Sequence, residues 1–128
     1  MSALNEFSFN NLLDDIKIIS KAVKILRDEH NPNARQYACN LVNDLLLRLS
    51  RDVEEANPTL IKYDQDKLLF DICIIKDSVQ IVRDENNYTN REFACELVEK
   101  LVDKLFSDMQ EMKETIKEEK KRWLEWLL

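Results

Sequence analysis

The stretches RDEHNPNARQYACNLV, at residues 27–42, and RDENNYTNREFACELV, at residues 83–98, are two versions of one sequence. They form the centre of a longer match, in which residues 12–52 align without a gap on residues 68–108 and 20 of the 41 pairs are identical. Unrelated segments of ordinary composition would share only a few residues. The chain therefore contains an internal duplication, which is the signature of a fold built from one repeated unit.

Each copy has the pattern of two helices joined by a tight turn. In each predicted helix, apolar residues recur at spacings of three and four and so share one face. His30-Asn31-Pro32 ends the first helix, because proline cannot continue it and restricts the preceding residue. We expect Asn33 to cap the next helix, and Thr89 with Glu92 to form a capping box at the same place in the second copy. The four apolar faces are Leu12, Ile16, Ile19, Val23 and Leu26; Ala38, Leu41, Val42, Leu45, Leu49 and Val53; Leu68, Ile72, Ile75, Val79 and Val82; and Ala94, Val98, Leu101, Leu105, Met109, Met112, Ile116 and Trp123.

The composition agrees with an all-helical fold. The 128 residues are 45 % apolar and 34 % charged, which suits one domain with a modest core. There is no glycine, although an all-β protein needs many turns that glycine supplies most readily. The sequence predicts an all-α domain over residues 1–128: two antiparallel helical hairpins related by duplication, in a four-helix, bundle-like arrangement with a long C-terminal helix.

The boundaries follow from breakers and capping residues. Repeat 1 covers about residues 10–56 and repeat 2 about residues 66–109, and residues 110–128 form an extension without a counterpart in repeat 1. Residues 1–9 are expected to be a short lead whose Phe7 and Phe9 pack on the first hairpin. The linker residues Leu60, Ile61 and Tyr63 are expected to pack on the core, and Asp64 to cap the third helix.

The fourth predicted helix has no breaker between Asn90 and Leu127. At 1.5 Å per residue it would be about 57 Å long, whereas the other three would be about 30–35 Å. The last helix should therefore overhang its neighbours, unless it kinks near residues 108–114.

The turn region resembles a helical hairpin of the HEAT or armadillo type, in which an acidic residue and a proline near the turn precede an arginine, an alanine and a leucine. In the second copy Tyr88 replaces the proline. The resemblance covers about fifteen residues per copy and implies protein binding rather than chemistry. The matching residues are Asp28, Pro32, Arg35, Ala38 and Leu41 in the first copy, and Asp84, Arg91, Ala94 and Leu97 in the second.

An arginine near the start of the second helix in each copy opposes the helix dipole, so it requires a specific partner. For Arg35 we expect a salt bridge to Asp28 or Glu29 across the turn. In the second copy the corresponding pair is Arg91 with Asp84 or Glu85. These pairs would hold each hairpin tip together, or else form a repeated binding surface at one end of the molecule.

The sequence predicts no catalytic residue, metal ligand or cofactor. His30 has no second histidine or cysteine at metal-binding spacing. Glu96 and Glu99 look like the Glu-x-x-Glu of MazG-type nucleotide pyrophosphohydrolases, but the second acidic helix that would complete a magnesium site is missing. These two carboxylates are therefore expected to belong to a solvated acidic face.

The charge and the cysteine content limit the possible partners and the cellular compartment of the protein. The net charge of −6 argues against direct binding of nucleic acid, since a phosphate-binding protein usually carries a basic excess. No stretch has membrane-spanning length, and the first residues lack the pattern of a secretory signal. Cys39, Cys73 and Cys95 show no CxxC spacing, so we expect free thiols in a reducing, cytoplasmic setting.

The final residues, KRWLEWLL, are too apolar to be left in water. They could fold over the bundle, form a dimer or partner interface, or lie on a membrane surface beside their basic residues. The primary hypothesis is a non-catalytic protein–protein interaction module that self-associates through its last helix as a homodimer. The alternatives are an acidic inhibitor of a nucleic-acid-binding protein and a magnesium-dependent nucleotide hydrolase. The expected partner-binding residues are Trp123, Leu124, Trp126, Leu127, Met112 and Ile116.

Overall fold

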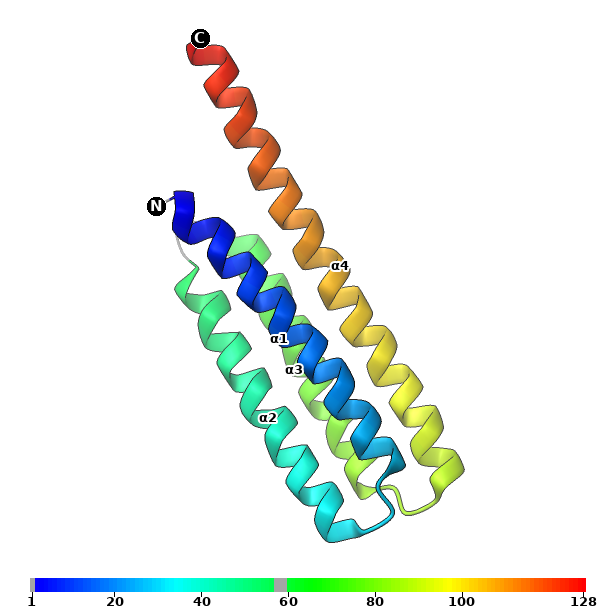
Figure 1. Ribbon diagram of the computed structural model, residues 1–128. Helices are drawn as coiled ribbons and strands as arrows, with labels where there is room; N and C mark the ends of the chain where they lie inside the picture. The colour runs from blue at the N-terminus through cyan, green and yellow to red at the C-terminus, as the bar shows by residue number, and fades with distance from the viewer. Residues whose placement is uncertain (1, 57–59) are drawn as a thin grey trace.

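The computed structural model describes the backbone of residues 2–56 and 60–128, and the side chains of residues 9–56 and 60–128. This part of the chain forms four α-helices and no strand: α1 (Ser2–Asp28), α2 (Pro32–Glu55), α3 (Lys62–Asp84) and α4 (Tyr88–Leu127). The helices alternate in direction, so both hairpin turns lie at one end of the molecule (Figure 1). The all-α fold with four helices is confirmed.

The four helices close into a bundle. Neighbours in the sequence pack against each other, α4 packs back onto α1, and α1 also touches α3 across the centre. The described residues thus form a ring of four helices, with α2 and α4 at opposite corners, rather than an open stack of two hairpins. The two copies of the duplicated hairpin face each other around one shared core, which is how four-helix bundles bury their apolar faces.

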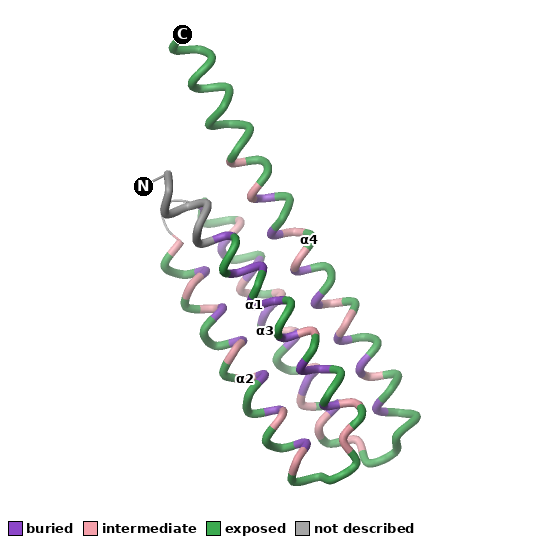
Figure 2. The backbone as a smooth tube through the Cα atoms, in the orientation of Figure 1, coloured by how far each residue is buried: buried purple, intermediate pink, exposed green. Residues whose placement is uncertain are grey.

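The buried faces of α1 and α3 are the ones that the sequence pattern predicts. All ten apolar positions expected on these two helices are buried in a single hydrophobic cluster. Figure 2 shows buried positions recurring along all four helices of the bundle. On α2, Cys39 and Leu46 take core positions that the pattern did not include.

Some of the expected packing is wrong. Leu41, expected on the inner face of α2, is exposed, because a step of one residue from the buried Val42 turns it about 100° away from the core. In the α2–α3 linker, Leu60 is buried as predicted, but Ile61 and Tyr63 are exposed. Phe9 is buried, whereas the side chain of Phe7 lies outside the described residues.

The helix starts differ from those predicted. Since no proline or glycine interrupts residues 2–9, α1 begins at Ser2 rather than Asn10. Asn31, not Asn33, caps α2, and its Oδ1 accepts hydrogen bonds from the backbone N–H groups of Asn33 and Ala34 at 2.8 and 3.4 Å. Asn87 caps α4 in the same way, in place of the expected Thr89.

The predicted cap of the third helix, Asp64, is also wrong. α3 begins at Lys62 after the apolar Ile61 and has no side-chain cap, so Asp64 lies inside its first turn. An acidic side chain in the first turn still interacts favourably with the helix dipole.

The core predicts a clear contrast between two leucines of α2. Leu49 is fully buried, while Leu47 is 51 % exposed. Leu49→Ala should lower the free energy of unfolding by about 2–5 kcal/mol, because it removes apolar contacts and leaves a cavity. The matched control Leu47→Ala should stay within about 0.5 kcal/mol of the original chain. Urea unfolding followed by circular dichroism measures both, and equal losses would contradict the assigned core.

Candidate interaction site

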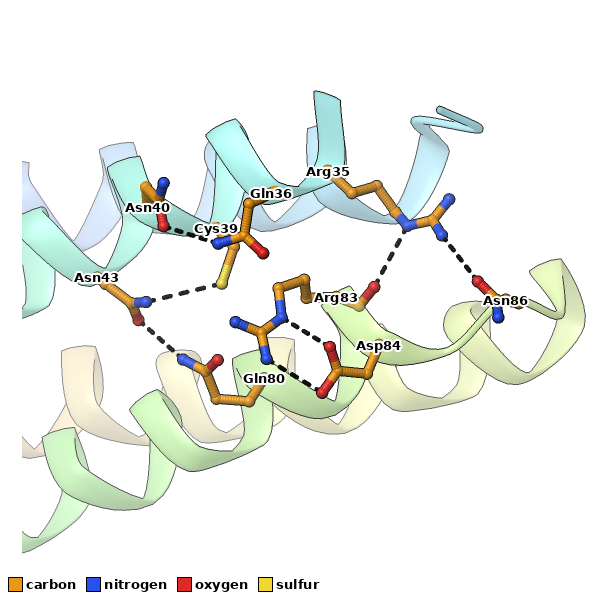
Figure 3. Close-up of polar contacts among 9 residues, drawn as sticks. All are labelled: Arg35, Gln36, Cys39, Asn40, Asn43, Gln80, Arg83, Asp84 and Asn86. Atoms are coloured by element: carbon orange, nitrogen blue, oxygen red, sulfur yellow. Dashed lines mark hydrogen bonds and ion pairs between the residues drawn. The ribbon is translucent and has the colours of Figure 1, made fainter. Parts of the chain in front are cut away.

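Two buried arginines join the hairpins at the turn end of the bundle. Arg35 is only 2 % exposed, and its Nη1 donates hydrogen bonds to the backbone carbonyls of Glu29 and His30 at 3.1 and 3.0 Å. Its Nε donates to the carbonyl of Arg83, at 3.4 Å, and its Nη2 to Oδ1 of Asn86, at 3.3 Å. Figure 3 shows this guanidinium reaching from α2 to the end of α3. Arg35 thus closes its own turn and binds the other hairpin.

Arg91 repeats this arrangement from the second copy. It is also 2 % exposed, and its Nη1 donates to the carbonyls of Glu85 and Asn86 at 3.2 and 3.0 Å. Its Nε donates to the carbonyl of Arg27, in the last turn of α1, at 3.4 Å. We call Arg35, Arg91 and the carbonyls they reach the arginine lock. It makes each hairpin hold the end of the other.

The salt bridges predicted at the hairpin tips are wrong, because their acidic residues pair with other arginines. Asp28 pairs with the neighbouring Arg27, and Asp84 with Arg83, each at 2.7 Å, rather than with Arg35 and Arg91. The hydrogen bonds from these arginines hold the pKa of both carboxyl groups below the ordinary value. The buried arginines bind carbonyls instead, because the last turn of a helix leaves several backbone acceptors unpaired and carries negative partial charge.

The last helix runs uninterrupted to Leu127 and projects well beyond the other three (Figure 1). Every residue from Lys117 to Leu128 is exposed, as the outer turns of α4 in Figure 2 show. Trp123 is 61 % exposed and Trp126 is 80 % exposed. We call residues 120–128 the tip. The interpretation in which this segment folds back over the bundle is therefore wrong.

The six expected partner-binding residues divide into two groups. Trp123, Leu124, Trp126 and Leu127 are exposed on the tip, which places them together on one projecting segment. Met112 is buried in the core and Ile116 packs against it, so these two belong to the base of the projecting segment. The structure thus separates an apolar tip from an apolar base on the same helix.

A groove lies at this base, where α4 leaves the bundle beside the start of α3. Its volume is about 280 Å³. Apolar side chains line it together with four acidic residues and one lysine, so its net side-chain charge is negative. Lys67 forms an ion pair with Asp108 within it, at 3.8 Å. The lining residues are Ile61, Asp64, Lys67, Asp108, Glu111, Met112, Thr115, Ile116 and Glu119.

Three exposed apolar positions recur in both hairpins. Ile25, Tyr37 and Leu41 are exposed on the first hairpin, and so are their duplication mates Ile81, Phe93 and Leu97 on the second. The sequence analysis did not predict their exposure, although large apolar residues at mate positions outside the buried face were a signal for it. None of these side chains is buried in the core.

The candidate chemical groups do not converge. Glu96 is exposed, and Glu99 accepts a weak hydrogen bond from the thiol of Cys95 at 3.8 Å. The ring of His30 lies 5.9 Å from that of Tyr88. Within the described residues, no three His, Cys, Asp or Glu side chains come together as they would around a metal ion.

None of the described helices combines the length and apolar character required to cross a membrane.

Comparison with family models, curated proteins and solved structures finds no match to this chain. The resemblance of the two turns to HEAT or armadillo hairpins therefore stays a prediction. Function must be inferred from the residues themselves, and the projecting end of α4 with the groove at its base is the most distinctive feature that they form.

The arginine lock predicts unequal effects for neighbouring arginines. Arg91→Ala should lower the free energy of unfolding by about 1–3 kcal/mol in total, since it removes a buried side chain that donates to three partly buried carbonyls. Arg83→Ala is the matched control, because it breaks only an exposed pair worth less than about 1 kcal/mol. Chemical denaturation compares the two variants. Equal stability of Arg91→Ala and Arg83→Ala would rule out a stabilising lock.

The three cysteines should differ in reactivity. Burial raises the pKa of Cys95 to about 12 and also raises the pKa of the Cys39 thiol, whereas Cys73 is exposed. Only the thiolate is reactive, so Ellman's reagent at pH 8 should modify one thiol quickly and the other two only after unfolding. Cys73→Ser should remove the fast phase. A fast phase that survives this substitution would show that a core thiol is accessible.

Proposed function

We propose that this chain is a non-catalytic protein–protein interaction module that self-associates through the projecting end of α4. The observation that carries the proposal is the tip, where Trp123, Leu124, Trp126 and Leu127 are exposed on a continuous helix. Exposed apolar surface of this kind marks interaction sites, and tryptophan is enriched among the residues that dominate binding energy.

The form of the surface favours a helical protein partner. Met112, Ile116, Trp123 and Leu127 follow one another at helical spacings, so they lie on one face of α4. Glu119, Arg122, Trp123 and Trp126 line a common hollow beside this stripe. A narrow apolar stripe between charged flanks is the kind of surface that pairs with another helix.

The charges of the projecting segment favour a second copy as that partner. Residues 110–119 contain four glutamates and two lysines, whereas residues 120–128 contain three basic residues and one glutamate. One half is therefore acidic and the other basic, so the segment is complementary in charge to a second copy that runs in the opposite direction. Such complementarity guides association and fixes orientation.

The cysteines bear on the compartment in which the protein works. Three unpaired cysteines, two of them buried, fit a reducing compartment such as the cytoplasm.

The proposal predicts that the tip tryptophans are required for self-association but not for folding. Trp123→Ala combined with Trp126→Ala should turn a dimer into a monomer, with α-helical content unchanged because both side chains are exposed. Tyr37→Ala with Phe93→Ala is the matched control, since these exposed aromatic residues lie on the sides of the bundle. Light scattering gives the molar mass and circular dichroism the helical content.

A chain that ends at Glu119 provides a second measurement. It should remain folded, because the tip makes no part of the core, and it should be monomeric. A monomeric full-length chain at high concentration would contradict self-association. In that case, binding to vesicles that contain anionic lipid would test the membrane-surface interpretation of the basic residues and tryptophans.

A further inference from the structure

We infer that two chains pair through antiparallel α4 segments, and that the tip of each chain inserts into the groove at the base of the other. This inference rests on the proposed self-association and adds to it a docking site, an orientation and a symmetry. The occupant of the groove lined by Ile61, Met112 and Ile116 is thus the tip of a second copy of this chain. The arrangement is reciprocal, so it closes as a twofold dimer.

The groove and the tip lie on the same face of α4. Met112, Thr115 and Glu119 line the groove, and Glu119 also lines the hollow that contains Trp123 and Trp126. A second helix laid along this face would therefore contact the tip and the groove together. Because α4 is continuous from Tyr88 to Leu127, these two parts keep a fixed spacing and orientation.

The register follows from the helix spacing. Met112 and Trp126 are each seven residues from Glu119, which is two helical turns or about 10 Å along the axis. A twofold axis near Glu119 therefore brings Trp126 of one chain beside Met112 of the other. With the helices in opposite directions, each tip reaches the start of the partner's α3, where Ile61 forms the far wall of the groove.

The charges favour this orientation over the parallel one. The groove contains Asp64, Asp108, Glu111 and Glu119 against a single Lys67, while the tip carries Lys120, Lys121 and Arg122 against Glu125. An antiparallel pair therefore places a basic tip against an acidic groove twice. A parallel pair would place the two basic tips together and the two acidic segments together, which is repulsive.

The apolar area is of the right order for a specific contact. Each tryptophan buries about 150–250 Å², so the four tryptophans of two chains supply about 600–1,000 Å². Specific interfaces start near 1,200 Å² of total buried surface. Leu124, Leu127 and the exposed Ile61 supply additional apolar surface on each chain.

The first test changes the groove without touching the last helix. Ile61, 64 % exposed, lies in the groove, and Ile25, 59 % exposed, lies near the turn end of α1. Ile61→Lys introduces a positive charge where a basic, apolar tip docks, so it should raise the dimer dissociation constant at least about tenfold. Ile25→Lys is the matched control and should leave the constant unchanged. Sedimentation equilibrium measures the constants, and circular dichroism checks that both variants fold.

The outcomes separate the two proposals. A large effect of Ile61→Lys without an effect of Ile25→Lys supports docking in the groove. Equal dissociation constants for the two variants, in a chain that is dimeric, overturn the groove inference while self-association through the tip stands. A monomeric original chain overturns both.

The second test measures the orientation by disulfide cross-linking in a Cys73→Ser background. Thr115 lines the groove and Arg122 lines the hollow, both are exposed, and they lie four residues before and three residues after Glu119. In an antiparallel pair they come opposite each other on the same edge of the interface, so a mixture of Thr115→Cys and Arg122→Cys chains should form a cross-linked heterodimer, whereas neither chain alone should cross-link. A parallel pair separates the two positions by seven residues, about 10 Å along the axis, so a dimer that forms no such heterodimer cross-link would overturn the inference.

Discussion

The rest of the structure depends on where the two hairpins are fixed to each other. Arg35 and Arg91 bind carbonyls at the ends of α1 and α3, and so hold both turns at one level. With one end of the bundle fixed, any difference in helix length must appear at the other end. Because α4 has 40 residues and α3 has 23, the excess of α4 extends beyond the bundle as a free segment. The lock and the projecting tip are therefore consequences of one arrangement.

The duplication explains why the lock is reciprocal. An arginine at the start of the second helix can reach the end of the first helix of its own copy and that of the other copy, because the bundle relates the copies by approximate twofold symmetry. Other polar contacts follow the same symmetry. Arg48 pairs with Asp15 between α1 and α2, and the mates Lys104 and Asp71 pair between α3 and α4. The exchange of Pro32 for Tyr88 is tolerated because each is the first residue of its helix, where no backbone N–H is needed.

The sequence predicted well the features that depend on periodicity. The buried stripes of α1 and α3, the two hairpins and the uninterrupted last helix follow from apolar spacing and from the position of breakers. The sequence predicted less well the features that depend on a choice between similar residues. Asn31 and Asn33 are equally able to cap a helix, and the decision lies with Pro32, which favours the first helical position.

The partners of the buried arginines could not be predicted in the same way. Acidic side chains are visible in a sequence, whereas the free carbonyls at a helix end are present whatever the residue. Arg27 and Arg83, immediately beside Asp28 and Asp84, bind these carboxylates locally and leave the carbonyls to Arg35 and Arg91. Likewise, Leu41 and Val42 are adjacent apolar residues, and the apolar spacing does not decide which of the two points into the core.

The projecting part of α4 differs from the rest of the chain in what stabilises it. Residues 88–112 are held by the core, whereas residues 117–128 are all exposed and depend mainly on helix propensity. An isolated helix of this length is marginal in water, and its tip exposes two tryptophans and three leucines. Burial against a second chain would stabilise the helix and cover these side chains at once. Because α4 is already one continuous helix to Leu127, the interface would cover the tip without having to form its helical structure.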